Sequence, residues 1–327
     1  LAFSGLTPFG KNEALLMSWR IIDIAEDGRY LHTERNWLVV EEKGREAGRA
    51  PLCDVQSVLV HAGHATYSHG LLLQLSAHDI PLVVCDKRHE PVAILLSLCG
   101  HHRHAGRVRA QTESSLPLRK RIWRDLVRKK ISEQARSLDP FDATGRDGLD
   151  KLTAKVRVGD PDNIEARAAR YYWPRLFGDD FRRDRTRSGL NAHLNYGYTI
   201  LRSALARAVT AAGLAPSLGV GHLNARNNFC LADDLLEPFR PLVDRLVLEN
   251  REAWKGDITP EARSELAGMM ARTILTDDGE TDLYRAMTLV VNSLADLFEK
   301  KAKKLYLPKE IAFITTPRLP GMEARHS

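Results

Sequence analysis

The spacing of the apolar residues changes near residue 100, and this change limits the fold more than any other feature of the sequence. Between residues 19 and 100 the apolar residues gather in short runs bounded by polar ones, as in β-strands. From residue 118 to about 303 they recur every three or four residues, as in amphipathic helices. We therefore expect an α+β protein, with an N-terminal β-rich domain followed by a larger all-α domain.

The N-terminal part is expected to hold several strands, one hairpin and one covering helix. Residues 29–32 and 37–40 flank a polar break, which predicts a hairpin. Residues 65–77 carry leucines at helical spacing, which predicts a helix. The remaining apolar runs predict strands at 18–24, 55–60, 81–86 and 91–96.

The length of 327 residues also favours two domains over one. We place the β-rich domain at 17–100 and the helical domain at 118–306. Residues 101–117, which begin with a histidine-rich stretch, are expected to be a linker, and residues 307–327 a tail. Residues 1–16 carry little pattern, and we interpret them as an extension or a cloning remnant before a native start at Met17.

Within the helical part, Gly213 stands just after a long predicted helix at 191–212, where a terminating glycine is expected. Further helices are predicted from about 233, at 259–275 and at 281–303. The first helix begins near 118, and the basic residues around its apolar stripe, Lys130 among them, are expected to face solvent.

The net charge of +6 and an isoelectric point near 9.1 are compatible with an anionic partner, although many basic proteins bind none. The stretch 178–189 is rich in arginine and suits contact with a phosphate backbone. A solvated surface is the alternative for this arm. Its arginines are Arg182, Arg183, Arg185 and Arg187.

The four cysteines form no C-x-x-C pair, so zinc-ribbon and redox motifs are absent, and a reducing cytoplasm is the expected location. No apolar run approaches the roughly 18 residues that a membrane helix needs, so no membrane partner is expected. The first residues lack the basic and then apolar pattern of a secretory signal.

Three residues are candidates for a metal site. A loop at 213–222, punctuated by glycine and proline, delivers His222, and an acidic helix start follows twelve positions later. On that helix Asp234 and Glu237 share a face, because they are three residues apart. Glu165 lies on another predicted helix. Two carboxylates and one imidazole could then converge on a divalent cation, with Glu165, His222 and Glu237 as ligands.

Each candidate also has a structural interpretation, and spacing alone does not decide between the two. Glu165 can be the glutamate of a capping box that begins at Asp162. His222 can be a hydrogen-bonded structural histidine. Glu237 can pair with Arg240 three residues later.

Four segments together resemble the CRISPR-associated integrase family, the first of the two proteins that insert new spacers into CRISPR arrays. The resemblance covers residues 17–310. A weaker likeness, in the opening at 19–20 and in residues 228–234, points to the branch found in type II systems. The four segments are NIEARAARYY at 163–172, NAHLNYGY at 191–198, GLAPSLGVGH at 213–222 and DLLEPFRP at 234–241.

This resemblance implies a function and a set of site residues. The family's Glu-His-acidic triad falls on Glu165, His222 and Glu237, where other branches have Asp at the last position, and it leaves open whether Asp233 or Asp234 assists. It implies a Mg²⁺- or Mn²⁺-dependent endonuclease and integrase, in which a DNA 3′-hydroxyl attacks a phosphodiester of the CRISPR repeat.

The resemblance also implies partners. These are double-stranded DNA, as spacer precursor and as repeat, a second copy bound through the N-terminal domain, and a small second spacer-acquisition protein that bridges two dimers. Two other functions stay open: a metal-dependent nuclease without integration, and a non-enzymatic DNA-binding scaffold in which the three residues are structural.

Overall fold

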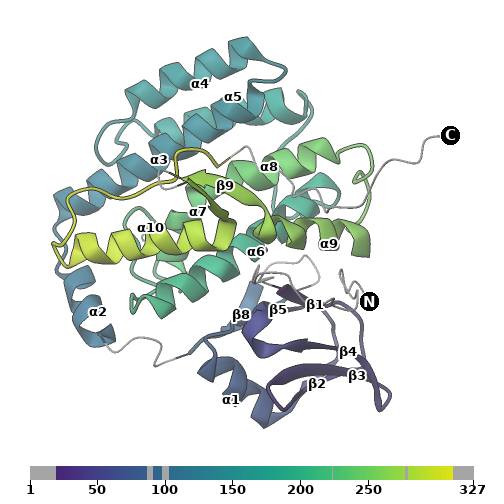
Figure 1. Ribbon diagram of the computed structural model, residues 1–327. Coiled ribbons are helices and arrows are strands. Elements are labelled where there is room, and N and C mark those ends of the chain that lie inside the picture. The colour runs from purple at the N-terminus through teal and green to yellow at the C-terminus, as the bar shows by residue number, and fades with distance from the viewer. Residues whose placement is uncertain (1–19, 87–90, 98–102, 223, 277–278, 312–327) are drawn as a thin grey trace.

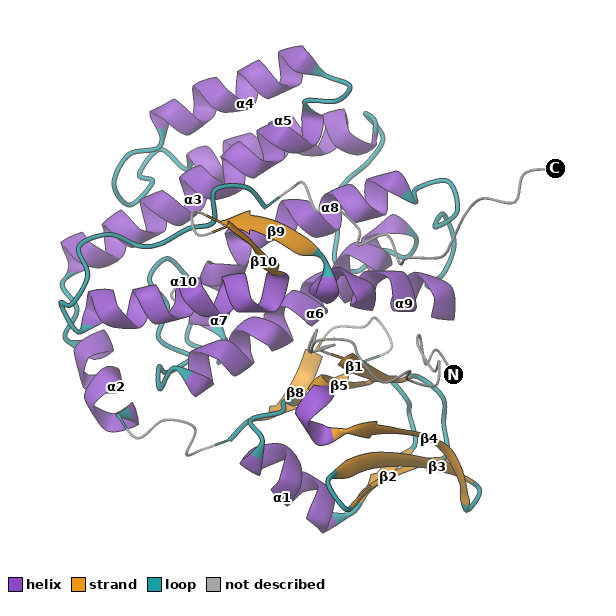
Figure 2. Cartoon of the chain, in the orientation of Figure 1, coloured by secondary structure: helices purple, strands orange, loops and turns teal. Residues whose placement is uncertain are grey.

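A computed structural model describes residues 20–86, 91–97, 103–222, 224–276 and 279–311 (Figure 1). The chain forms a strand-rich part followed by a larger, mostly helical part, which confirms the predicted α+β class (Figure 2). Residues 1–16, interpreted above as an extension, lie outside the described residues. In the described part of the chain, no helix combines the length and the apolar character that crossing a membrane requires.

The strand-rich part contains two four-stranded sheets that enclose one apolar core. In the first sheet three neighbours run parallel and the last is antiparallel. Its order is β1 (Arg20–Ile24), β5 (Val55–Val60), β7 (Leu82–Cys85) and β8 (Pro91–Leu95).

The second sheet contains the predicted hairpin, which is confirmed by the pairing of Leu31 with Val40. Its order is β4 (Arg45–Pro51), β3 (Trp37–Glu42), β2 (Arg29–Glu34) and β6 (Ala65–Tyr67). Strand β4 was not predicted, because its sequence is polar and it lies at a sheet edge, where few side chains are buried.

Helix α1 (His69–Ala77) covers the sheets and begins after Ser68, whose side chain accepts the N–H of Leu71. The prediction of helix from residue 65 was wrong over its first residues. These form β6, which pairs with β2, so the tertiary pairing overrides the local helical pattern.

The helical part is built around α6 (Leu190–Ala211), most of whose residues are buried. Gly213 follows it with φ +68°, as the terminating position requires. The neighbouring helices are α3 (Leu116–Leu138), α4 (Ala143–Lys155), α5 (Ile164–Phe177), α7 (Cys230–Leu236), α8 (Arg240–Glu249), α9 (Pro260–Gly268) and α10 (Leu283–Phe298).

Two expectations about the second part need correction. The predicted linker contains a helix, α2 (His104–Thr112), which packs against α10. The part is not all-α, because β9 (Thr273–Thr276) and β10 (Gly279–Asp282) form a hairpin where helix ends were predicted. The β-branched residues of β9 favour a strand. The described residues of the predicted tail, 307–311, contact α3, because Lys129 donates a hydrogen bond to the Lys309 carbonyl.

The two parts contact each other through charged side chains. Asp23 of β1 pairs with Arg263 of α9 at 2.7 Å. Arg207 of α6 donates to the carbonyls of Val55 and Gln56 at the start of β5. The strand-rich part is therefore tied to the central helix α6 (Figure 1).

Candidate functional site

Two of the three predicted ligands meet at one lysine. Lys130, in the middle of α3, has its ammonium 2.5 Å from Glu237 Oε2 and forms a second ion pair with Glu165 Oε1. Lys130 is only 7% exposed and Glu237 4%, so this is a buried cluster. The fold thus brings together two carboxylates that are far apart in the sequence and directs both at the same cation.

The start of α5 positions Glu165 without using its side chain. Asp160 accepts the N–H groups of Ile164 and Glu165 at 2.9 and 3.0 Å, so it caps the helix. Asp162 instead pairs with Arg157. The capping-box interpretation of Glu165 is therefore contradicted, and its carboxylate contacts Lys130.

Glu237 opens a short 3-10 turn, η2 (Glu237–Phe239), between α7 and α8. Its Oε1 accepts the Nε–H of Arg240 at 2.9 Å, as the structural interpretation expected, while Oε2 faces Lys130. Burial opposes ionisation, but Arg240 and Lys130 outweigh it and lower the pKa of Glu237 to about 2. Glu237 is consequently a carboxylate at neutral pH.

His222 is oriented by Asp234. The Asp234 carboxylate, with no exposed surface, accepts the backbone N–H groups of Val220, Gly221 and His222, and lies 2.6 Å from His222 Nδ1. Because an ionised carboxylate only accepts, we assign the proton to Nδ1, which leaves the Nε2 lone pair for a metal. The hydrogen bond to Asp234 raises the pKa of His222, partly offset by burial.

The loop that holds His222 packs against α3. A Cβ atom on Gly221 would lie 2.2 Å from the Trp123 ring, so glycine is needed for this approach. The His222 ring stands edge-on to Trp123, with centroids 5.2 Å apart. Helix α3 therefore presents Trp123 to the histidine and, two turns later, Lys130 to the carboxylates.

Gln111 is a positioning residue that sequence reasoning missed. It is 3% exposed and lies in α2, within the predicted linker. Its amide donates to the carbonyls of Ala215 and Leu218 and accepts the Ala215 N–H, all at 2.9–3.0 Å. The loop before His222 is thereby held at two points, Ala215 and Leu218. No local pattern marks a glutamine for such a role.

Lys130 was expected in solvent, and the structure places it in the core. The signal was present, because Ile122, Leu126 and Lys130 follow one another at four-residue spacing along the apolar stripe. A lysine inside an apolar stripe requires an anionic partner, and here it has two.

The structure does not bring all three predicted ligands into a single cluster. Among the described residues, no group of three His, Cys, Asp or Glu side chains is close enough to hold a metal ion. Glu165 and Glu237 lie together, and His222 is near enough that the charge of Glu237 helps raise its pKa. The donor set nevertheless fits Mg²⁺ or Mn²⁺, because in the described part of the chain the buried Glu237 Oε2 accepts no hydrogen bond and is paired with the Lys130 ammonium.

The two aspartates beside Glu237 have different surroundings. Asp234 points toward the His222 loop and is saturated with donors. Asp233 points to the opposite side, where it pairs with Arg202 at 2.7 Å and accepts from Asn227. Of the two, Asp234 is therefore the one placed to support the candidate ligands.

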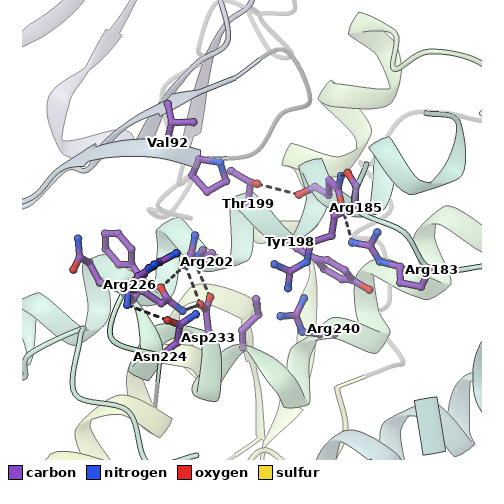
Figure 3. Close-up of a pocket in the computed structure, with 16 residues that line it drawn as sticks. Val92, Arg183, Arg185, Tyr198, Thr199, Arg202, Asn224, Arg226, Asp233 and Arg240 are labelled. Atoms are coloured by element: carbon purple, nitrogen blue, oxygen red, sulfur yellow. Dashed lines mark hydrogen bonds and ion pairs between the residues drawn. The ribbon is translucent and has the colours of Figure 1, made fainter. Parts of the chain in front are cut away.

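A basic cavity of about 380 Å³ lies on the Asp233 side, between β8 and the helices α6 and α7 (Figure 3). Among the described residues that line it, Asp233 is the one carboxylate, and the Tyr198 and Phe229 rings provide flat surfaces. Arg240, which donates to Glu237, is part of the lining, so the cavity adjoins the carboxylate cluster. The lining guanidinium groups are Arg183, Arg185, Arg202, Arg226 and Arg240.

The predicted arginine arm divides at this cavity. Arg183 and Arg185 line it, and Arg183 donates to Asn191 and Asn195. Arg182 instead donates to the carbonyls of Asp179 and Phe181, and Arg187 pairs with Asp184. Two of the four arginines of the arm, Arg183 and Arg185, therefore line the cavity.

Comparisons with known proteins agree with this architecture. Residues 22–288 match the family model described as CRISPR associated protein Cas1. The chain is 34% identical over 300 residues to the CRISPR-associated endonuclease Cas1 of Neisseria meningitidis serogroup C (strain 8013), covering 90% of this chain and 97% of that protein. It is 30% identical to a second Cas1 endonuclease, from Pyrobaculum aerophilum, over 75% of this chain and 88% of the relative.

A solved structure shares the fold. The structure of a casposase bound to integration product superimposes with a TM-score of 0.75 at 20% sequence identity, over 91% of this chain and 96% of that one. Because the family model spans most of the chain and the Neisseria relative matches it nearly end to end, the chain belongs to the Cas1 family of CRISPR-associated proteins.

Proposed function

We propose that this protein is a metal-dependent DNA endonuclease and integrase that inserts short foreign DNA into a CRISPR array. The observation that carries the proposal is the convergence of Glu165 and Glu237 on one buried cation, beside a histidine whose Nε2 is free of its orienting carboxylate. The Cas1 endonuclease relatives and the casposase fold support the same reading.

Glu165, Glu237 and His222 are the proposed ligands of Mg²⁺ or Mn²⁺. When bound, such a cation stabilises the charge that develops on a phosphodiester under attack. Glu237 is suited to this task because it stays ionised, and Asp234 is suited because it holds the imidazole in the ligating tautomer. Arg240 fixes the Glu237 carboxylate from its other oxygen.

The attacking group in the proposed reaction is a DNA 3′-hydroxyl, and the leaving group is the 3′-oxygen of the cut repeat strand. One phosphodiester forms as one breaks, so no nucleotide cofactor is needed. With water as the attacking group the same site would be a nuclease. This second function is kept because the carboxylates and histidine serve both attacks alike.

The basic cavity is proposed to take DNA close to the reacting phosphate. In the part of the lining that the structure describes, five guanidinium groups and one carboxylate favour an anion, and the aromatic rings of Tyr198 and Phe229 suit unpaired bases. Its contact with the site through Arg240 would hold a strand within reach of Glu237.

The proposed partners follow from the family. They are spacer-precursor and repeat DNA, a second copy joined through the strand-rich part, and a small second spacer-acquisition protein between two dimers. We propose further that the protein belongs to the type II branch and that it acts in the cytoplasm, where it can reach the CRISPR array.

A strand-transfer assay tests the function. Wild-type protein with Mn²⁺ should join a short duplex to a repeat-containing target, while Glu165→Gln, His222→Ala and Glu237→Gln should each abolish joining, because ligands act as a unit. Glu252→Gln, at an exposed glutamate, is the matched control and should join normally. Cut but unjoined products from the wild type would support the nuclease, and full joining by Glu165→Gln would contradict the metal site.

A further inference from the structure

The carboxylate cluster is electrically neutral without a metal. Glu165 and Glu237 carry two negative charges, and Lys130 and Arg240 carry two positive ones. A divalent cation added to this set would give a buried cluster a net charge of +2. Such an excess is costly in a poorly hydrated site, so a resident cation has to leave when the metal enters.

The two resident cations are held differently. Arg240 donates its Nε–H to Glu237, and its guanidinium lies 4.6 Å from the Tyr198 ring centroid, so it is fixed by geometry as well as by charge. Among the described residues, the ion pairs and hydrogen bonds of the Lys130 ammonium are with the two carboxylates. An ammonium on a flexible four-carbon chain also adapts more easily than a guanidinium.

Lys130 also stands where the metal ligands converge. Its ammonium contacts Glu165 on α5 and Glu237 on η2, and no other side chain contacts both carboxylates among the described residues. Two carboxylates this close, one of them buried, would repel each other without a cation between them. Lys130 therefore keeps the two proposed ligands together.

We propose that Lys130 is an internal competitor of the divalent cation: it holds Glu165 and Glu237 together while no metal is bound, and the metal must displace its ammonium to bind. This inference rests on the proposed metal site and adds to it a residue that sets metal affinity. It also accounts for the absence of a three-ligand cluster among the described residues, because the lysine occupies the centre.

The test compares Mn²⁺ binding and thermal unfolding of the full chain. Lys130→Met should bind Mn²⁺ at least about tenfold more tightly than wild type, measured from free Mn²⁺ by electron paramagnetic resonance, because nothing has to be displaced. In EDTA the variant should melt at a lower temperature than wild type, and Mn²⁺ should raise its melting temperature by more. Lys129→Met, next along α3 but paired with Glu133 and not with the proposed ligands, is the control for Mn²⁺ binding and should bind Mn²⁺ as wild type does.

Each result decides the matter. A Lys130→Met protein that is unfolded in EDTA and folds in Mn²⁺ supports the proposal in its strongest form, and one that stays unfolded in both overturns it. Unchanged or weaker Mn²⁺ binding by a folded Lys130→Met, with wild-type binding that Glu165→Gln removes, overturns the role of Lys130 alone. Wild-type protein that binds no Mn²⁺, or Glu165→Gln that still binds it, overturns the metal site and the inference together.

Discussion

Asp234 and His222 are joined twice, through the backbone N–H of His222 and through its Nδ1, both on the same carboxylate oxygen. This pair fixes the ring and the protonated nitrogen of a proposed ligand. It places Asp234, which the sequence left undecided against Asp233, behind the ligand rather than in the ligand set.

Asp234→Asn should weaken Mn²⁺ binding by about 10- to 100-fold, because an amide cannot accept all the donors around it and the imidazole loses its orientation. Metal binding requires neutral His222, whose raised pKa means that affinity increases as pH rises through that value. Without the aspartate the pKa should fall and the pH midpoint of Mn²⁺ binding should move to lower pH. An unmoved midpoint would show that Asp234 does not control the histidine.

Asp244 should destabilise the fold at neutral pH relative to acid pH. Burial raises its pKa to about 6, against the opposing hydrogen bonds from Tyr198 and Tyr172. A carboxyl whose pKa is raised in the folded state contributes its full stability at pH values below its unfolded pKa, which is near 4. This contribution, up to about 3 kcal/mol in the free energy of unfolding, is lost as pH rises through 6. The difference in unfolding free energy between wild type and Asp244→Asn, measured by urea titration at pH 4 and 7, should change by that order and in that direction.

The basic cavity predicts which arginines matter for DNA. Arg185→Gln and Arg226→Gln should each flatten the salt dependence of duplex binding, by up to about 0.9 log units per lost phosphate contact. Arg182→Gln and Arg187→Gln, whose side chains are engaged elsewhere, are the matched controls and should keep the wild-type slope. Equal effects from Arg182→Gln, Arg185→Gln and Arg187→Gln would support the continuous arm predicted from sequence.

Gln111→Ala should lower the free energy of unfolding by about 1–3 kcal/mol, since it leaves backbone groups of the His222 loop without partners. Strand transfer should fall with it, because the histidine is no longer fixed. Thr112→Ala, the next residue and an exposed one, controls for disturbance of α2. Normal joining by a destabilised Gln111→Ala would limit this residue to a structural role.

The strand-rich part is predicted to make the dimer. Light scattering should give the molar mass of a monomer for a chain that begins at residue 103 and that of a dimer for the full chain. An unchanged dimer from the shortened chain would move the interface to the helical part.

The sequence was sufficient for the fold class, for most strands and for the long helices, since these depend on hydrophobic period. It was insufficient for α2 and β4, because their sequences are polar and their secondary structure depends on the elements that they pack against. In the site, Glu165 and Glu237 were predicted through the resemblance. Gln111 was missed because its role comes from long-range contacts that no local spacing encodes. The spacing of Lys130 places it in the apolar stripe, but its two partners are distant in the sequence.

The position of α2 has a mechanical consequence. It is the first described helix after the strand-rich part, and through Gln111 it holds the backbone that leads to His222. A displacement of the strand-rich part that shifts α2 would therefore also shift the loop that carries His222. This route is separate from the Asp23–Arg263 contact. Binding of a second molecule to the strands would then change the orientation of the His222 imidazole.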